Sequence, residues 1–257
     1  MIANYHTHTP RCNHASGTEE EYILSAIDGG LEILGFADHS PYWFTDAGDY
    51  YSTFRMRPEE LPDYVRTLSR LRRQYSDRLQ LHIGVEAEYY PKYFRELKER
   101  LRDGGVEYMI MGQHFPGNEI GQTHTSRPTA DEDVLSRFCD QMIEGIQTGD
   151  FTYIAHPDVL HFVGEDAAYH RHAVRLCREA KACGVPVEIN FLGIRDGRYY
   201  PDMRFWQAAG EEGCKVIFGC DAHSPDVLKD PVTEQRALEM VRTYGLQLIH
   251  KLEPVKF

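Results

Sequence analysis

The chain opens with the stretch Met1-Ile2-Ala3-Asn4-Tyr5-His6-Thr7-His8, and a second stretch of the same kind, Lys215-Val216-Ile217-Phe218-Gly219-Cys220-Asp221-Ala222-His223, lies near its end. In both, a short apolar run with strand character is followed by two side chains of metal-binding type. Alternate residues of a strand point to the same side. His6 and His8 can therefore bind one cation, and so can Asp221 and His223. We expect two strands whose ends meet at a metal site.

Further residues of the same chemical type lie between these stretches, nearly all of them at the end of a strand-like segment. The complete set of candidate metal ligands is His6, His8, His14, His39, Glu86, His114, His156, Asp221 and His223. A parallel barrel brings the ends of its strands to one face, which would gather these residues from distant parts of the sequence. A catalytic metal uses about three protein ligands, so the set predicts about two or three divalent ions.

The ligand chemistry narrows the choice of metal. Neutral imidazole nitrogens and carboxylate oxygens, with no thiolate partner at a suitable spacing, favour zinc, manganese or iron over calcium or a structural cysteine zinc site. Any one of these histidines, taken singly, is more often a hydrogen-bonded residue of the core or surface than a ligand. The interpretation as ligands rests on the whole set, because the pattern repeats at the end of one strand after another.

Strand-like and helix-like segments alternate along the chain without a low-complexity linker. The expected strands are residues 1–5, 32–37, 79–88, 106–112, 151–155, 186–190 and 215–220. The expected helices are residues 18–28, 58–75, 93–102, 129–148, 167–183, a helix from 202, and 232–244. This alternation predicts an α/β protein whose right-handed crossovers close a parallel sheet into a barrel, with the active site at the strand C-termini. We expect one catalytic domain over residues 1–257.

The composition argues against several other classes of protein. The 257 residues carry 28 Lys and Arg against 40 Asp and Glu, a formal net charge of −12, which opposes binding to nucleic acid. No apolar run approaches the roughly 20 residues of a transmembrane helix. The six cysteines show no CxxC spacing, and no signal-peptide pattern precedes the first strand. We expect a cytoplasmic protein with reduced thiols and with no nucleic-acid or membrane partner, of an oligomeric state that the sequence does not predict.

The ordered set of candidate ligands resembles the motifs of the polymerase and histidinol phosphatase (PHP) superfamily along nearly the whole chain. Five segments are similar to those of the stand-alone L-histidinol-phosphate phosphatases: Gly35-Phe36-Ala37-Asp38-His39-Ser40, Val85-Glu86-Ala87-Glu88-Tyr89-Tyr90, Gly112-Gln113-His114-Phe115, Ala155-His156-Pro157-Asp158 and Glu188-Ile189-Asn190. The resemblance implies a distorted (β/α)7 barrel with a trinuclear metal centre. It assigns one ion to His6, His8, Glu86 and Asp221, a second to Glu86, His114 and His156, and a third to His14, His39 and His223.

The activity implied by this resemblance is metal-dependent hydrolysis of a small phosphate monoester. L-histidinol phosphate, an intermediate of histidine biosynthesis, is the leading substrate. One alternative is a phosphoesterase of the same family that acts on another small phosphate or on nucleotide ends. Another is a metal-binding module without catalysis, for which a missing ligand would be expected.

Two residues outside the ligand set are candidates for catalysis. Asp158 follows His156 by two positions, so on a continuing strand both would face the same side. Asp158 would then protonate the leaving group, or instead orient an imidazole. Arg195 lies in a glycine-containing loop after the strand 186–190. A loop arginine is usually a solvated surface charge, but the resemblance favours a phosphate clamp with two hydrogen bonds.

Two long segments break the alternation of strands and helices. Residues 40–56 leave from His39, and an irregular aromatic loop of this length is usually a lid or a binding loop. In this loop Trp43 and Phe44 either form flat walls for a planar imidazole or only pack the loop down. Residues 115–127 leave from His114, and we expect His124 in this segment to be an ordinary surface residue.

Overall fold

One parallel sheet, in which eight strands follow the order of the chain, forms the centre of the protein. The structure is a computed structural model that describes residues 1–48, 50 and 52–257. Its strands are β1 (Ala3–Asn4), β2 (Ile33–His39), β3 (Gln80–Ala87), β4 (Tyr108–Met111), β5 (Phe151–Ile154), β6 (Val187–Asn190), β7 (Lys215–Gly219) and β8 (Gln247–Leu248). The first seven match the predicted strands. The eighth was not predicted, because two residues are too short for a periodic signal.

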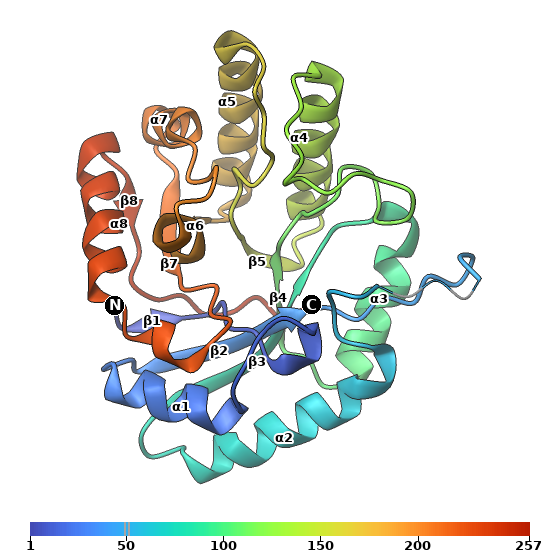
Figure 1. The fold of residues 1–257 in the computed structure, drawn as a ribbon, viewed down its shortest axis with the longest axis vertical. Coiled ribbons are helices and arrows are strands. Elements are labelled where there is room, and N and C mark those ends of the chain that lie inside the picture. Colours follow the sequence, from blue (N-terminus) through green and yellow to red (C-terminus); the bar gives the residue numbers. More distant parts are fainter. Residues whose placement is uncertain (49, 51) are drawn as a thin grey trace.

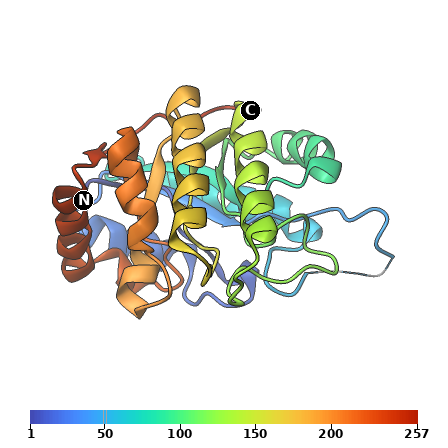
Figure 2. The same ribbon diagram turned by 90° about the horizontal axis from the view of Figure 1, so that it is seen from above.

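Helices connect the strands and cover the outside of the sheet. They are α1 (Glu19–Asp28), α2 (Leu61–Gln74), α3 (Pro91–Asp103), α4 (Glu132–Gln147), α5 (Asp166–Cys183), α6 (Phe191–Asp196), α7 (Met203–Glu212) and α8 (Pro231–Tyr244), with 3-10 turns η1 (Pro10–Cys12), η2 (Pro58–Glu60) and η3 (Pro225–Leu228). Figure 1 shows the longer helices as an outer ring, and in Figure 2 α8, α7, α5 and α4 stand in a row. Within the described residues, no helix has the length and apolar character needed to span a membrane.

The two edges of the sheet meet beyond the ends of β1 and β7. There Thr7 and Ala222 pair as an isolated parallel bridge. The His8 amide donates to the Ala222 carbonyl over 2.9 Å, and the Ala222 amide donates to the His6 carbonyl over 3.2 Å. At the other end of β7, the short strand β8 pairs with it instead. The predicted distorted (β/α)7 barrel is thus confirmed, and its seam closes directly beside four of the candidate ligands.

A layer of tyrosines fills the barrel beneath this face. Tyr5, Tyr108 and Tyr153 are buried in a small cluster formed by alternate strand residues, and the Tyr108 hydroxyl donates to the Tyr5 carbonyl over 2.8 Å. Glycine is required at positions 35 and 84, because a Cβ on Gly35 or Gly84 would lie 2.2 or 2.3 Å from the Tyr108 side chain. This packed layer gives the face above it a closed floor.

Two element boundaries differ from the prediction for local reasons. Helix α4 was predicted to begin at residue 129 but begins at Glu132. The reason is that Asp131 is its N-cap and accepts a hydrogen bond from the Asp133 amide. The segment predicted as a loop after β6 contains the helix α6. The Asn190 side chain caps this helix by accepting from the Gly193 amide over 3.0 Å.

Candidate metal centre

All nine candidate ligands lie near the C-terminal ends of the strands. His6 and His8 follow β1, His14 follows η1, His39 ends β2, Glu86 lies in β3, His114 and His156 follow β4 and β5, and Asp221 and His223 follow β7. A cleft of about 800 Å³ opens over this face. Seven of the nine line the cleft, while His6 and His8 are fully buried.

The Glu86 carboxylate lies at the centre of the cluster. Its Oε1 lies 2.7 Å from His156 Nε2 and 3.6 Å from His114 Nε2. The imidazoles near its Oε2 belong to His39 (Nδ1 at 2.9 Å), His6 and His8 (Nε2 at 3.6 Å in each). A Cβ at Gly112 would lie 1.8 Å from Oε1, so glycine there makes room for the carboxylate. With imidazoles on both of its oxygens, Glu86 is placed to bridge two cations.

Asp221 contributes a second carboxylate next to the buried histidines. Its Oδ1 lies 3.1 Å from His8 Nε2 and 3.5 Å from His6 Nε2. The backbone of Asp221 has a positive φ of 47°, which turns the chain away from the line of β7. Its other oxygen, Oδ2, accepts a hydrogen bond from Asn190 Nδ2 over 3.0 Å. The orientation of the carboxylate is therefore fixed before any ligand binds.

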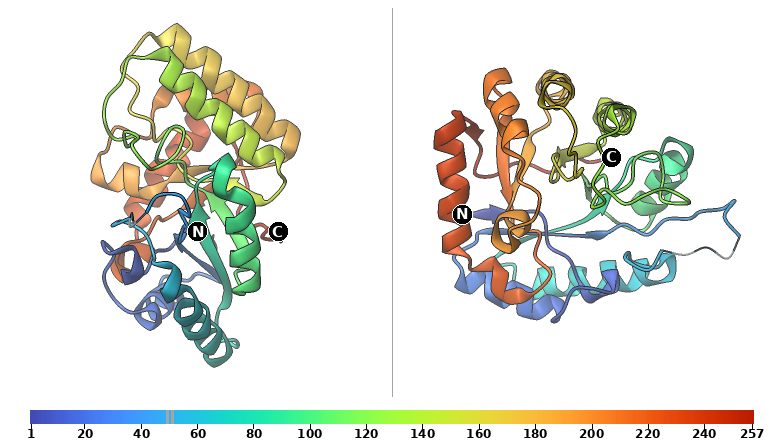
Figure 3. Two further views of the ribbon diagram at one scale, coloured as in Figure 1. Left: turned by 90° about the vertical axis from the view of Figure 1, so that its right-hand side faces the viewer. Right: turned by 45° about the horizontal axis from the view of Figure 1, so that its top comes forward.

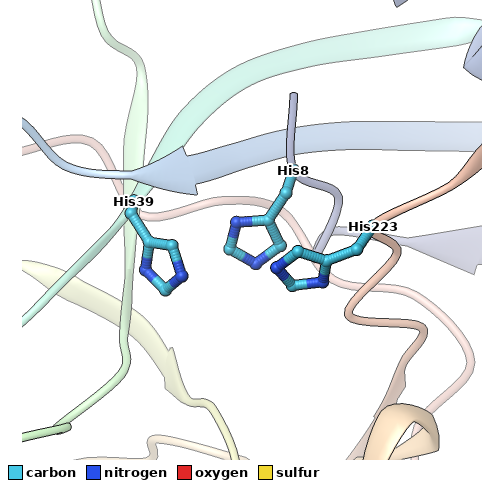
Figure 4. A group of neighbouring side chains, drawn as sticks. All are labelled: His8, His39 and His223. Carbon is cyan, nitrogen blue, oxygen red and sulfur yellow. The ribbon is translucent and has the colours of Figure 1, made fainter. Parts of the chain in front are cut away.

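The imidazoles in this cluster leave ring nitrogens free. Figure 4 shows His8, His39 and His223 turned toward one space, and one nitrogen from each lies within 4.8 Å of the others. Among the described residues, nothing hydrogen-bonds to His6 Nε2, His8 Nε2 or His223 Nε2, although all three atoms are buried. Unpaired buried polar atoms are rare in folded proteins. The arrangement fits divalent cations, which such nitrogens and carboxylates bind.

Three further carboxylates lie next to the opposite nitrogens of these rings. They are Glu188 (Oε1 at 2.8 Å from His6 Nδ1), Glu88 (Oε1 at 3.0 Å from His114 Nδ1) and Asp38 (Oδ1 at 3.5 Å from His8 Nδ1). The contacts of Glu188 and Glu88 fix the tautomers of His6 and His114 and leave Nε2 of each ring for a metal. Asp38 lies near His8 Nδ1 without a hydrogen bond to it. This role of Glu88 and Glu188 was not predicted from the sequence. For Glu88 a signal existed, because it follows Glu86 by two positions at the end of the same strand.

The electrostatics of the cluster favour cations. Burial alone would raise the pKa of Glu86, but neighbouring imidazoles, led by His39, hold it well below its usual value. Burial would likewise lower the pKa of His6, but the carboxylates of Glu188 and Asp221 raise it to about 10. Anionic oxygens therefore persist in a region shielded from water, where the attraction for a divalent ion is strong.

Asp158 lies away from the cleft, and this corrects both roles predicted for it. The chain turns at His156, whose φ is 30°, so the strand alternation that would place residues 156 and 158 on one side does not hold. Asp158 Oδ2 accepts hydrogen bonds from the Asp202 amide (2.7 Å) and from the Trp206 indole (2.9 Å). Asp158 therefore fastens the start of α7 to the end of β5.

Arg195 also points away from the cleft, which corrects its predicted role as a phosphate clamp. In α6 its guanidinium is turned toward the start of α8, with Nη1 3.8 Å from Asp230 Oδ2. Arg198, three residues further on, lines the cleft instead. Its Nη1 donates to the Tyr200 hydroxyl over 3.3 Å and its Nη2 to Asp196 Oδ2 over 3.3 Å. Arg198 was not predicted from the sequence, because the direction of its side chain depends on the helix α6, and a loop was predicted there.

Trp43 and Phe44 pack the loop against α3, which is the second of the two roles predicted for them, and they do not line the cleft. The Arg100 guanidinium lies 4.9 Å from the Trp43 ring centroid, and Phe44 meets Tyr93 edge to face at 5.3 Å. Figures 1 and 3 show the loop after β2 leaving the barrel on the side of α3. Phe54, near the end of this loop, lines the cleft.

His124 also lines the cleft, which corrects the expectation of an ordinary surface residue. Its ring stacks on His114, with centroids 5.9 Å apart, and meets Phe54 at 89° over 6.5 Å. The Thr125 amide donates to the His114 carbonyl over 2.9 Å and folds the segment back over the site. Burial lowers the pKa of His124 to about 4, so its imidazole is neutral near pH 7.

Comparisons with known proteins agree with this geometry. Residues 4–191 match the family model of the PHP domain. A probable histidinol-phosphatase of Deinococcus radiodurans is 30% identical over 238 residues, 87% of each chain. The histidinol-phosphatase of Bacillus subtilis is 24% identical over 247 residues, 85% of this chain and 92% of its own. A Lactococcus lactis histidinol phosphate phosphatase, crystallised with zinc, L-histidinol and phosphate, superposes with a TM-score of 0.74 at 17% identity over 96% of this chain and 95% of that one. This chain belongs to the PHP domain family.

Proposed function

We propose that this protein is a metal-dependent phosphatase that hydrolyses L-histidinol phosphate to L-histidinol and inorganic phosphate, as one catalytic domain over residues 1–257. The observation that carries the proposal is the cluster of imidazoles around Glu86 beneath an open cleft, with ring nitrogens that lack hydrogen-bond partners among the described residues. Membership of the PHP family supports it. The names of the relatives in Deinococcus radiodurans and Bacillus subtilis support the choice of substrate.

The donor set suits about two or three divalent ions of zinc, manganese or iron. Ligand atoms within 4.8 Å of one another form the groups His6, His8 and Glu86; His6, His156 and Asp221; and His8, His39 and His223. Because these groups share residues, the ions would lie close together, with Glu86 between two of them. Bound divalent ions supply Lewis-acid stabilisation of a phosphate ester and lower the pKa of attacking water.

The residues of the cleft wall are suited to bind the rest of the substrate. Arg198 presents a guanidinium, which can bind a phosphate through two parallel hydrogen bonds. Asp196 and Tyr200 hold this guanidinium in place. Phe54 and the neutral imidazole of His124 offer flat surfaces for a planar ring. Local positive charge from Arg198 and the ions would attract a phosphate dianion despite the net charge of −12.

A panel of substrates tests the proposal. The metal-loaded protein is assayed for kcat/KM on L-histidinol phosphate, p-nitrophenyl phosphate and a nucleoside 5′-monophosphate. We expect L-histidinol phosphate to be preferred by at least about 100-fold, because polar groups matched to a substrate discriminate strongly against analogues that lack them. Equal rates on all three would favour a phosphatase for another small phosphate. Loaded protein that hydrolyses none of them would instead be a metal-binding module.

A further inference from the structure

Arg55, at the end of the segment 40–56, is a buried cation next to the metal centre. Its exposed fraction is only 2%. The guanidinium donates two hydrogen bonds to Glu88, from Nη1 to Oε2 and from Nη2 to Oε1, each over 3.0 Å. Nη2 and Nε both donate to Glu119 Oε2, over 2.6 and 3.0 Å, and Nη1 also donates to the Ser40 carbonyl over 2.9 Å. Every nitrogen of this guanidinium therefore has a partner.

Glu88 connects this cation to a candidate metal ligand. The same Oε1 that accepts from Arg55 lies 3.0 Å from His114 Nδ1. Pairing of both carboxylate oxygens with the planar fork of a guanidinium fixes the plane of the carboxylate. Oε1 is then held where it accepts the Nδ1 proton of His114, which leaves Nε2 of that ring directed at Glu86 Oε1, 3.6 Å away. Arg55 thereby acts on the imidazole through the carboxylate.

The other contacts of Arg55 fasten two parts of the cleft wall. Glu119 belongs to the segment 115–127, and His124 of that segment lines the cleft. Phe54 lines the cleft as well, and its ring centroid lies 4.5 Å from the Arg55 guanidinium carbon. One buried cation thus joins a carboxylate that orients a metal ligand to the segments that surround the substrate.

Stability alone does not account for this network of buried charges. Taking charges out of water costs free energy that offsets their mutual attraction, so well-packed apolar side chains are often equally stabilising. A fork-like ion pair adds a fixed geometry instead. Here two buried carboxylates, those of Glu88 and Glu119, share one guanidinium. Such an arrangement suits a position where the direction of a carboxylate matters.

We propose that Arg55 is a positioning residue that acts on His114 through Glu88. The proposal rests on the metal-dependent function proposed above, in which His114 is a ligand. With the fork intact, Glu88 keeps its contact with Nδ1, and His114 offers Nε2 to the ion in one orientation. Without the fork, Glu88 can rotate away and the imidazole loses its support. Loss of Arg55 therefore weakens the binding of the ion at His114 and loosens the ring.

Proton NMR of cobalt-loaded protein tests this link without reference to activity. Cobalt shifts the ring N–H proton of a histidine ligand away from the rest of the spectrum, and the signal that is lost in His114→Gln identifies that of His114. We expect this proton to exchange with water on the order of 10 times faster in Arg55→Lys than in the wild type, because lysine keeps the charge but cannot form the fork.

Tyr50→Phe is the matched control, because it removes a hydrogen bond from the same network and leaves the fork intact. The Tyr50 hydroxyl donates to Glu119 Oε1 over 2.6 Å. The exchange rate of the His114 proton in this variant should equal that of the wild type. Equal rates in Arg55→Lys and the wild type would overturn the proposal.

A double-mutant cycle tests whether the effect passes through Glu88. Arg55→Lys should weaken metal retention under graded chelator by about 10-fold, at the low end of the range for residues that support metal ligands. In a Glu88→Gln background the same change should add little, because residues that act through one contact are not additive. Additive losses would mean that Arg55 stabilises the protein independently of Glu88, and would overturn the proposal.

A second variant covers the case in which Arg55→Lys does not fold. Arg55→Met combined with Glu119→Gln removes one charge of each sign, and it too should show faster exchange of the His114 proton. In the wild type itself, exchange as fast as that of the exposed His14 ring would overturn the proposal even if no variant folds. Faster exchange in variants of a protein that does not hydrolyse L-histidinol phosphate would refute the proposed substrate and not the role of Arg55. Hydrolysis with unchanged exchange would refute only the role of Arg55.

Discussion

The buried carboxyl group of Asp158 links folding to pH without contacting the cleft. Burial raises the pKa of Asp158 to about 7, although hydrogen bonds from the Asp202 amide and the Trp206 indole act in the opposite direction. In an unfolded chain an Asp titrates near 3.9. Between about pH 4 and pH 7 the folded protein therefore binds a proton that the unfolded chain releases. The stability from this group is complete below about pH 4 and is lost as the pH rises toward 7.

We predict that Asp158→Asn removes this dependence on pH. Asparagine retains an oxygen that can accept from the Asp202 amide and the Trp206 indole, but it does not titrate. Urea unfolding of metal-loaded protein should show the wild type losing up to about 4 kcal/mol relative to the variant between pH 4 and pH 7, since each pKa unit corresponds to about 1.4 kcal/mol. Turnover should change little. A constant difference across this range would mean that Asp158 stays ionised in the folded protein.

The arginines of the segment after β6 allow a matched comparison of two side chains of the same type. We predict that Arg198→Ala lowers kcat/KM on every phosphomonoester by about 10- to 100-fold, because hydrogen bonds to charged groups contribute about 1.5 to 3 kcal/mol. Lysine should rescue poorly, because it does not make the planar contact with two hydrogen bonds. Arg195→Ala is the control and should leave kcat/KM nearly unchanged. A larger loss of kcat/KM in Arg195→Ala than in Arg198→Ala would mean that Arg195 is the phosphate clamp after all.

Local sequence signals predicted most elements and missed those that depend on tertiary packing. The capping box at Thr18 and the cap at Asp202 are encoded within one helical turn, and both helices begin where these signals place them. Helix α6 is too short for a periodic pattern and packs against α8. Treating it as a loop left the side-chain directions of Arg195 and Arg198 undetermined. The direction of Asp158 was wrong for a similar reason, because a left-handed residue ends the strand alternation.

Two glycines at strand ends make space for the carboxylates of the centre. A Cβ at Gly112, after β4, would lie 1.8 Å from Glu86 Oε1, and a Cβ at Gly219, in β7, would lie 1.7 Å from Glu188 Oε1. Neither glycine has a positive φ, so their role is to provide space and not backbone freedom. The elements therefore shape the site through small residues as well as through the ligands.

We predict that Gly112→Ala displaces Glu86 and weakens metal binding on the order of 10- to 100-fold, as changes in the support of a ligand do elsewhere. Metal content after dialysis against graded chelator measures the effect. Gly184→Asn is a suitable control, because a Cβ there meets open space and asparagine tolerates the left-handed C-cap of α5. Equal metal retention in the two variants would show that Glu86 can shift without loss of binding.

At the scale of the whole molecule, the candidate ligands join the two edges of the barrel. His6 and His8 follow the first strand, and Asp221 and His223 follow the seventh, yet one short bridge at Thr7 and Ala222 pairs these segments. The repeated pattern of ligand types after strands predicted this convergence. The role of Glu188 could not be predicted in the same way, because it contacts His6 across 182 positions of sequence. Cations at the seam would add cross-links that the backbone does not supply.

We therefore predict that removing the metals opens the barrel at the seam between β1 and β7. An ion present at 100 times its dissociation constant adds about 2.7 kcal/mol of stability, so chelation should lower the melting temperature. In hydrogen exchange, the amides of His8 and Ala222, which pair across the seam, should lose protection first. Amides along the long β2 and β3 pairing, such as that of Phe36, serve as the internal reference. An equal loss of protection at both places would mean that the metals stabilise the barrel as a whole and do not close it.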